Sequence, residues 1–174
     1  MIAVKLEQRV AIELRAEGRR LIGHAARFGV EARIGDFTEV IQAGAFTASL
    51  ASGRDVLALV DHNPEKLLAR SKSGTLRLAE DSTGLAFEIN LPSTQVASDV
   101  LALAERNDLG GMSFGFLPAK GGEHWDGNRR TLTAVDLFEV SVVSSWAAYE
   151  GTTVNARSRA PRLALARRYL ETVR

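Results

Sequence analysis

Residues 109–118 constrain the fold of this chain more than any other stretch. They read Leu-Gly-Gly-Met-Ser-Phe-Gly-Phe-Leu-Pro, which predicts a short strand that follows a Gly-Gly turn and ends at proline. Side chains alternate between the faces of a strand, so one face carries three large apolar residues: Met112, Phe114 and Phe116. That face is predicted to be core. Ser113 and Gly115 share the opposite face, where the missing glycine side chain leaves room for a molecule to approach the serine.

Further short apolar or alternating runs, separated by turn residues, predict many more strands. They cover residues 11–15, 20–27, 56–60, 67–70, 75–78, 85–91, 130–135 and 137–143. Two helices are expected, a short one that ends near Ser52 and a longer one, capped by Ser93 or Thr94, that runs to about residue 106. This pattern predicts a β-rich α+β domain, a closed or nearly closed antiparallel β-barrel with helices packed outside.

Composition limits the classes of protein to which the chain can belong. With 174 residues, 45% of them apolar, it is long enough for one domain with a sizeable core. The net charge of +1 gives no general argument for binding nucleic acid or an anionic membrane. There is no cysteine, which excludes thiol nucleophiles and disulfides. No run approaches the roughly 18 apolar residues of a membrane helix, so we expect a soluble protein.

The end of the chain differs from the rest. Arginines are frequent from Arg157 onward, and apolar residues recur at helical spacing after Pro161: Leu163, Ala166, Leu170 and Val173. We therefore expect a domain over residues 1–156 and a basic amphipathic tail helix over residues 157–174.

Three residues could carry acid–base and nucleophilic chemistry. His62 lies just after the apolar run 56–60, and Glu139 is a carboxylate within the apolar run 137–143. A serine hydroxyl becomes a nucleophile when an imidazole takes its proton, and a carboxylate orients that imidazole. Ser113, His62 and Glu139 therefore form a candidate Ser-His-Glu triad.

Other interpretations of these residues remain open. Asp136 is a rival third member, and Glu139 could instead face water or pair with Arg130. Ser113 could be a small packing residue, and His62 could bond its own turn. A metal site is a competing possibility, with ligands drawn from six residues: His24, His62, His124, Asp61, Glu123 and Asp126. The spacing of these residues matches no metal motif. We expect no metal or cofactor.

Several motifs in order along residues 19–157 resemble the prohead (capsid-maturation) proteases of tailed bacteriophages. The segments that carry the resemblance are Gly44-Ala45-Phe46, Asp61-His62-Asn63-Pro64, residues 68–71, 74–78, 84–87, 112–116 and 137–143, and the ending Ala148-Tyr149…Thr152. One departure is visible, because Ala147 stands where the family usually has proline before Ala-Tyr.

The resemblance implies a fold and a task. The family is similar to the herpesvirus assemblins, β-barrels wrapped by helices, which implies Ser113 as nucleophile and His62 as general base. Glu139 matches the position of the third assemblin residue, a histidine. The task implied is cleavage of the scaffolding segment of the major capsid protein, and of the protease itself, inside the procapsid in the cytoplasm of the bacterial host. Self-association is a possible further contact, while nucleic acid and membrane are not required. The alternative is a catalytically silent barrel that acts as a scaffold or binding module.

Overall fold

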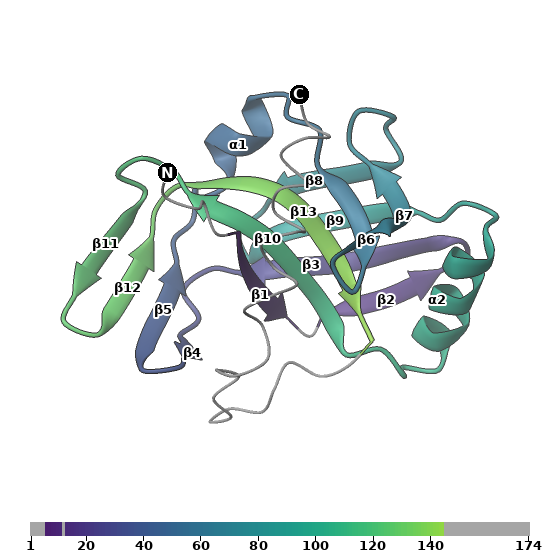
Figure 1. The fold of residues 1–174 in the computed structure, drawn as a ribbon, viewed down its shortest axis with the longest axis horizontal. Helices are drawn as coiled ribbons and strands as arrows, with labels where there is room; N and C mark the ends of the chain where they lie inside the picture. Colours follow the sequence, from purple (N-terminus) through teal and green to yellow (C-terminus); the bar gives the residue numbers. More distant parts are fainter. Residues whose placement is uncertain (1–5, 12, 145–174) are drawn as a thin grey trace.

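The computed structural model describes residues 6–11 and 13–144, and these form thirteen strands and two helices (Figure 1). The β-rich α+β class predicted from the sequence is confirmed. The elements are β1 (Glu7–Ala11), β2 (Leu14–Glu17), β3 (Arg20–Arg27), β4 (Ala32–Ile34), β5 (Phe37–Ile41), α1 (Thr47–Ala51), β6 (Leu57–Val60), β7 (Asn63–Arg70), β8 (Leu76–Glu80), β9 (Gly84–Asn90), α2 (Gln95–Glu105), β10 (Gly111–Pro118), β11 (Glu123–Asp126), β12 (Arg129–Leu132) and β13 (Val135–Val143).

The strands form three sheets. The first has the order β1-β10-β13-β6-β7, the second β11-β12-β5-β4 and the third β2-β3-β9-β8. No closed barrel is found among the strands of the described residues, so the predicted barrel is not confirmed. Two of the pairs, β13 with β6 and β12 with β5, are parallel, contrary to the antiparallel arrangement expected. Parallel neighbours need a long crossover between them, and a strand pattern does not reveal which distant strands such a crossover unites.

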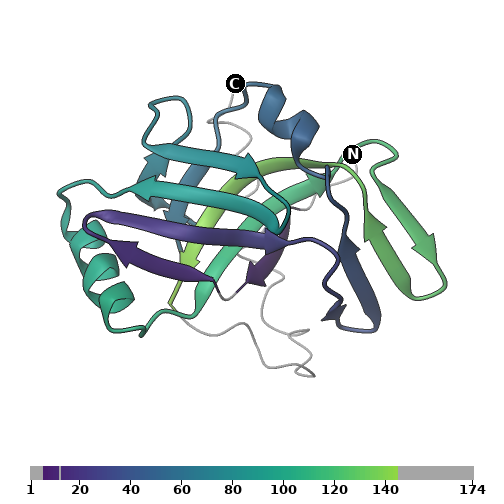
Figure 2. The same cartoon turned by 180° about the vertical axis from the view of Figure 1, so that it is seen from behind.

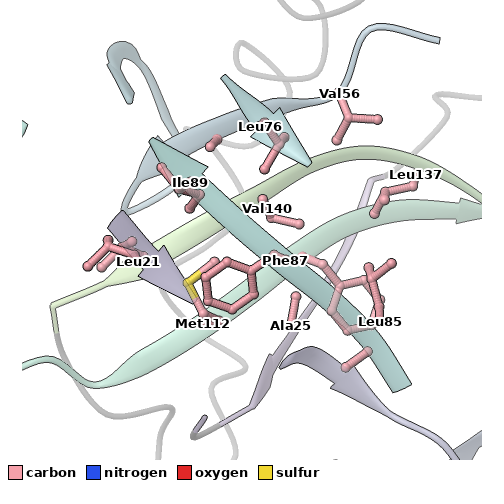
Figure 3. Close-up of a cluster of buried hydrophobic side chains, with 14 of the residues drawn as sticks. Leu21, Ala25, Val56, Leu76, Leu85, Phe87, Ile89, Met112, Leu137 and Val140 are labelled. Carbon is pink, nitrogen blue, oxygen red and sulfur yellow. The ribbon is translucent and has the colours of Figure 1, made fainter. Parts of the chain in front are cut away.

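The main core lies between the first and third sheets (Figure 3). The figure shows Met112, Leu137 and Val140 from the first sheet facing Leu85 and Phe87 from the third. The predicted apolar face of β10 is part of this core, because Met112, Phe114 and Phe116 are at most 1% exposed. The strand at residues 111–118 therefore has the core face that its alternation predicts.

The faces of β13 do not follow strict alternation. Alternation along residues 137–143 predicts that Phe138 shares a face with Val140 and Val142, but Leu137 packs with those valines in the main core, and Phe138 packs with Leu59 in a smaller cluster. The pairing of β13 with β10 shifts register between Gly115 and Phe116. A bulge adds one residue to one strand and so changes which side chains share a face.

The helices begin and end close to the predicted residues. Thr94 caps α2, its side chain accepting a hydrogen bond from the Ala97 amide. Helical spacing predicts an apolar stripe of Val96, Val100, Leu103 and Ala104 on this helix. Of these residues Val100 and Ala104 are buried, but Leu103 is exposed. Figure 2, seen from behind, shows α2 beside β2 at one end of the third sheet. Neither helix of the described residues is long and apolar enough to cross a membrane.

Two strand boundaries differ from the expectation. The first predicted strand, at residues 11–15, divides into β1 and β2, and β1 pairs with β10 rather than with its neighbour in the chain. The second boundary concerns Pro64, since a proline after the apolar run 56–60 predicts that the strand stops there, whereas Pro64 lies inside β7. There β7 is the edge of its sheet, where proline costs no ladder hydrogen bond. The tail helix predicted over residues 157–174 lies outside the described residues, and the predicted domain boundary is not tested.

A buried ion-pair cluster connects β1 to the second sheet. Glu39 on β5 is 2% exposed, and its carboxylate contacts Arg9 Nε at 2.5 Å and Arg130 Nη1 at 3.1 Å. Arg130 also contacts Glu7 at 2.5 Å and Glu123 at 2.7 Å. Burial lowers the pKa of Arg130, but its bonds to carboxylates outweigh that effect and the pKa is raised. The cluster holds strands from distant parts of the sequence together.

Replacing Arg130 should destabilise the fold strongly. In Arg130→Ala, Glu39 keeps its buried charge but loses one of its two cations, and we expect the free energy of unfolding to fall by about 3–5 kcal/mol. Arg129→Ala is the matched control on the same strand, because that side chain is 53% exposed and pairs at 3.2 Å with exposed Glu31; its cost should stay below about 0.5 kcal/mol. Equal losses in urea unfolding of the two variants would contradict this prediction.

Acid should weaken the same cluster. Burial raises the pKa of Glu7, but the Arg130 hydrogen bond and the charges of Arg9 and Arg130 together lower it below its usual value. A carboxylate whose pKa is depressed on folding stabilises the protein above its unfolded pKa, and this contribution is lost as pH falls. The stability difference between the wild type and Glu7→Gln should therefore be largest near neutral pH and shrink below about pH 4. Urea unfolding at several pH values measures it, and a difference independent of pH would contradict the prediction.

Candidate active site

Ser113 lies in the middle of β10, between two neighbouring strands. Ser113 stands opposite Val10 in the pairing with β1 and opposite Ser141 in the pairing with β13. Residues directly opposite in an antiparallel pair share a face of the sheet, so the Ser113 and Ser141 side chains are neighbours. Ser113 is fully buried, and its Oγ has no hydrogen-bond partner among the described residues. A buried hydroxyl without a partner is costly, which makes this serine unusual in a packed sheet.

Glu139 occupies the same face of the sheet, two residues before Ser141. It is 1% exposed and stands opposite Gly115 in the register of β10 and β13. A Cβ atom at Gly115 would lie 2.3 Å from Glu139 Oε1 and 2.9 Å from Leu6 Cδ2. Gly115 therefore provides the space that the carboxylate fills, whereas the sequence predicted that this space would let a molecule approach Ser113.

His62 is placed by a two-residue turn between β6 and β7. Val60 pairs with Asn63, and both central residues have positive φ, 49° at Asp61 and 57° at His62. A type I′ hairpin turn requires this conformation, which is uncommon for residues other than glycine, although Asp and His adopt it more readily than most. The Asp61 carboxylate accepts hydrogen bonds from Ser144 N at 2.8 Å and Ser144 Oγ at 2.9 Å. The turn is thereby attached to the residue that follows β13.

The turn brings the imidazole to the buried carboxylate. His62 Nδ1 lies 2.6 Å from Glu139 Oε1, and the other oxygen, Oε2, accepts a hydrogen bond from the Ser141 hydroxyl. Both carboxylate oxygens thus have a donor when the Nδ1 of the ring carries its proton. This tautomer leaves Nε2 as the acceptor.

The structure brings His62 and Glu139 into contact, and it places Ser113 on the same sheet face without a hydrogen bond to His62. The rival Asp136 does not join them, since its carboxylate lies 3.5 Å from Arg54. The suggested pair between Glu139 and Arg130 is wrong, because Arg130 belongs to the cluster with Glu7, Glu39 and Glu123.

Nothing in the described residues favours the metal alternative. They contain no group of three or more histidine, cysteine, aspartate or glutamate side chains that could hold a metal ion. His24 instead contacts Asp81 at 2.7 Å and Glu13 at 3.1 Å. The hydrogen bonds that Asp81 accepts from His24 and from two backbone amides lower the pKa of the Asp81 carboxyl to about 2. A cleft of about 650 Å³ lies beside His24 on the third sheet. Its lining includes neither Ser113, His62 nor Glu139.

Sequence reasoning missed two residues of this site, Ser141 and Gly115 in their roles toward Glu139. A usable signal existed for Ser141, because Glu139 and Ser141 are two residues apart on one strand and so share a face. The role of Gly115 depends on the register between β10 and β13, which no local pattern reveals.

The surroundings of the Glu139 carboxylate are apolar, with Leu57 and Leu59 of β6 opposite Glu139 and Ser141. Low local polarity strengthens the bond between the carboxylate and the imidazole.

Comparison with known proteins gives one result. A family model described as caudovirus prohead serine protease matches residues 7–164 of the chain. The comparisons with curated proteins and with solved structures found no match.

Filling the space at Gly115 should disrupt the site. In Gly115→Ala the new methyl group must displace the Glu139 carboxylate, so we expect about 1–3 kcal/mol of lost stability and a changed NMR signal of the His62 Nδ1 proton. A double-mutant cycle with Glu139→Ala is the control, because removing the carboxylate removes its clash with the methyl group. If the cost of Gly115→Ala is the same with and without the carboxylate, the glycine does not serve Glu139.

Proposed function

Because the chain belongs to the family of caudovirus prohead serine proteases, we propose that it is an endopeptidase that uses Ser113, His62 and Glu139 as its triad. The resemblance inferred from sequence motifs is confirmed by the family match. The observation that carries the residue assignment is the 2.6 Å contact between His62 Nδ1 and Glu139 Oε1, on the sheet face that also bears Ser113.

The proposed reaction follows the roles that these groups can take. Ser113 Oγ attacks the carbonyl carbon of the scissile peptide, and His62 Nε2 takes the hydroxyl proton. Glu139 holds the imidazole in the tautomer with a proton on Nδ1 and stabilises the imidazolium that forms. The imidazolium then gives its proton to the leaving amine, and water, activated by His62, hydrolyses the acyl-enzyme.

This proposal requires Ser113 and His62 to approach each other. The hydroxyl is buried and has no partner among the described residues, so it is free to donate to an imidazole nitrogen. Catalytic hydrogen bonds are often long in substrate-free sites and shorten when substrate binds. The proposed mechanism therefore requires His62 Nε2 and Ser113 Oγ to come within hydrogen-bond distance when an extended peptide is bound.

We propose the scaffolding segment of the major capsid protein as substrate, cleaved inside the procapsid in the bacterial host, and the protease itself as a second one. Family membership supports this assignment, because a prohead protease acts during capsid maturation. The net charge of +1 gives no general argument for a nucleic-acid partner, and the proposal includes none.

Replacing Ser113 should abolish cleavage without harming the fold. We expect Ser113→Ala to leave a co-expressed cognate capsid protein at full mass, while the wild type truncates it. Since the substitution removes a buried hydroxyl without a partner, the free energy of unfolding should stay equal or rise by about 1 kcal/mol. Intact-mass spectrometry of both proteins and urea unfolding measure the two effects.

Glu139→Gln and Ser98→Ala complete this experiment. Glu139→Gln keeps the shape of the side chain but removes the negative charge that stabilises the imidazolium, so cleavage should slow by about 10²-fold or more. Ser98→Ala removes an exposed hydroxyl on α2, whose partner is the Thr94 carbonyl, and should cleave normally. Truncation of the capsid protein by Ser113→Ala would refute the proposed nucleophile.

A catalytically silent scaffold is the second candidate. It is favoured by one observation, that Ser113 is fully buried and not bonded to His62. Equal masses of the capsid protein with wild type and Ser113→Ala, in cells where procapsids have formed, would support this candidate.

A further inference from the structure

Glu139 is buried to 1% exposure, and a buried charge is stable only when its oxygens are paired. His62 Nδ1 pairs with Oε1, which leaves Oε2 to the Ser141 hydroxyl. The torsion that turns a glutamate carboxylate about its own axis is broad and has no steep minimum. Without a second donor, the carboxylate could therefore rotate out of the orientation in which Oε1 faces the imidazole.

Ser141 is well placed to prevent this rotation. It is fully buried on β13, two residues beyond Glu139 and on the same sheet face, so the strand itself holds its hydroxyl beside Oε2. Gly115 on the neighbouring strand leaves room for the carboxylate, because any side chain there would occupy the space of Oε1. The glycine thus accommodates the carboxylate, and the hydroxyl on its own strand holds its orientation.

The two neighbouring serines have different surroundings. Ser113 and Ser141 stand opposite each other in register, yet Ser141 donates to Glu139 while Ser113 has no partner in the described part of the chain. A donor already committed to a carboxylate does not compete for the imidazole. The arrangement leaves Ser113 free to interact with His62.

We propose that Ser141 is a positioning residue of the peptidase, whose hydroxyl fixes the Glu139 carboxylate so that the latter orients His62. This inference rests on the proposed function. Ser141 acts through Glu139 and does not touch the reacting atoms. The bond is to a charged group in an apolar setting, where hydrogen bonds are strong.

The test compares Ser141→Thr with Ser141→Val. These two side chains have nearly the same shape and differ by one hydroxyl, so any packing cost is common to both. Cleavage is measured on a peptide that spans the junction identified in the capsid protein. We expect Ser141→Thr to retain kcat within about threefold of wild type, and Ser141→Val to lose about 10- to 100-fold in kcat with KM changed less than about twofold.

A second measurement needs no activity. In the Ser113→Ala background, the NMR signal of the His62 Nδ1 proton reports the bond to Glu139. It should be retained in Ser141→Thr and should move upfield or exchange faster with water in Ser141→Val. Ser49→Ala is the control for loss of a buried hydroxyl next to the same strand, since Ser49 accepts from the Leu137 amide at 2.8 Å and makes no hydrogen bond to Glu139 among the described residues. It should leave the signal unchanged.

The outcomes separate the two proposals. If Ser113→Ala still cleaves, the proposed nucleophile is wrong, but the NMR comparison still tests the link from Ser141 to His62. If Ser113→Ala is inactive and the Thr and Val variants have equal kcat, or the Nδ1 signal is the same in both, Ser141 has no positioning role. A loss confined to Ser141→Val in both measurements supports the inference.

Discussion

The antiparallel pairing of β10 and β13 is the constraint on which the rest of the structure depends. The two strands are neighbours in the centre of the five-stranded sheet, with β1 on one side and β6 on the other. Their inner faces supply Met112, Phe114 and Val140 to the main core. Their outer faces place Ser113 opposite Ser141 and Gly115 opposite Glu139. One register therefore determines both the packing of the core and the composition of the site, and a slip by one residue would exchange the two faces.

Two buried carboxylates show how differently the fold uses charge. Glu39 is surrounded by Arg9 and Arg130, and this cluster joins β1 to the second sheet. Glu139 contacts an imidazole and a hydroxyl instead of a permanent cation. An arginine keeps its charge throughout the accessible pH range, which suits a structural role. An imidazole can take up and release a proton, which suits the general-base role proposed for His62.

Much of the local structure was predictable because it follows from short-range rules. Thr94 caps a helix because its side chain can accept a hydrogen bond from a backbone amide. The apolar run at residues 56–60 forms a strand that lies between two other strands, β13 and β7. The prediction that Pro64 stops a strand is wrong, because a proline is tolerated on an edge strand and only the sheet order shows that β7 is one. The faces of Leu137 and Phe138 depended on a bulge, which requires knowledge of the partner strand. Barrel closure remains a prediction.

The sequence by itself determined the chemistry that is available: a serine next to a glycine on a strand, a histidine after an apolar run, and a carboxylate inside another. It also carried the family resemblance, through motifs whose order along the chain is specific. Only the tertiary structure decided which of these groups meet. The strained turn at Asp61 brings His62 to Glu139, and the register of β10 and β13 gives that carboxylate its space at Gly115 and its neighbour Ser113. Contacts between residues about 80 positions apart in the chain depend on how strands pair, and strand pairing is settled by burial of the whole core.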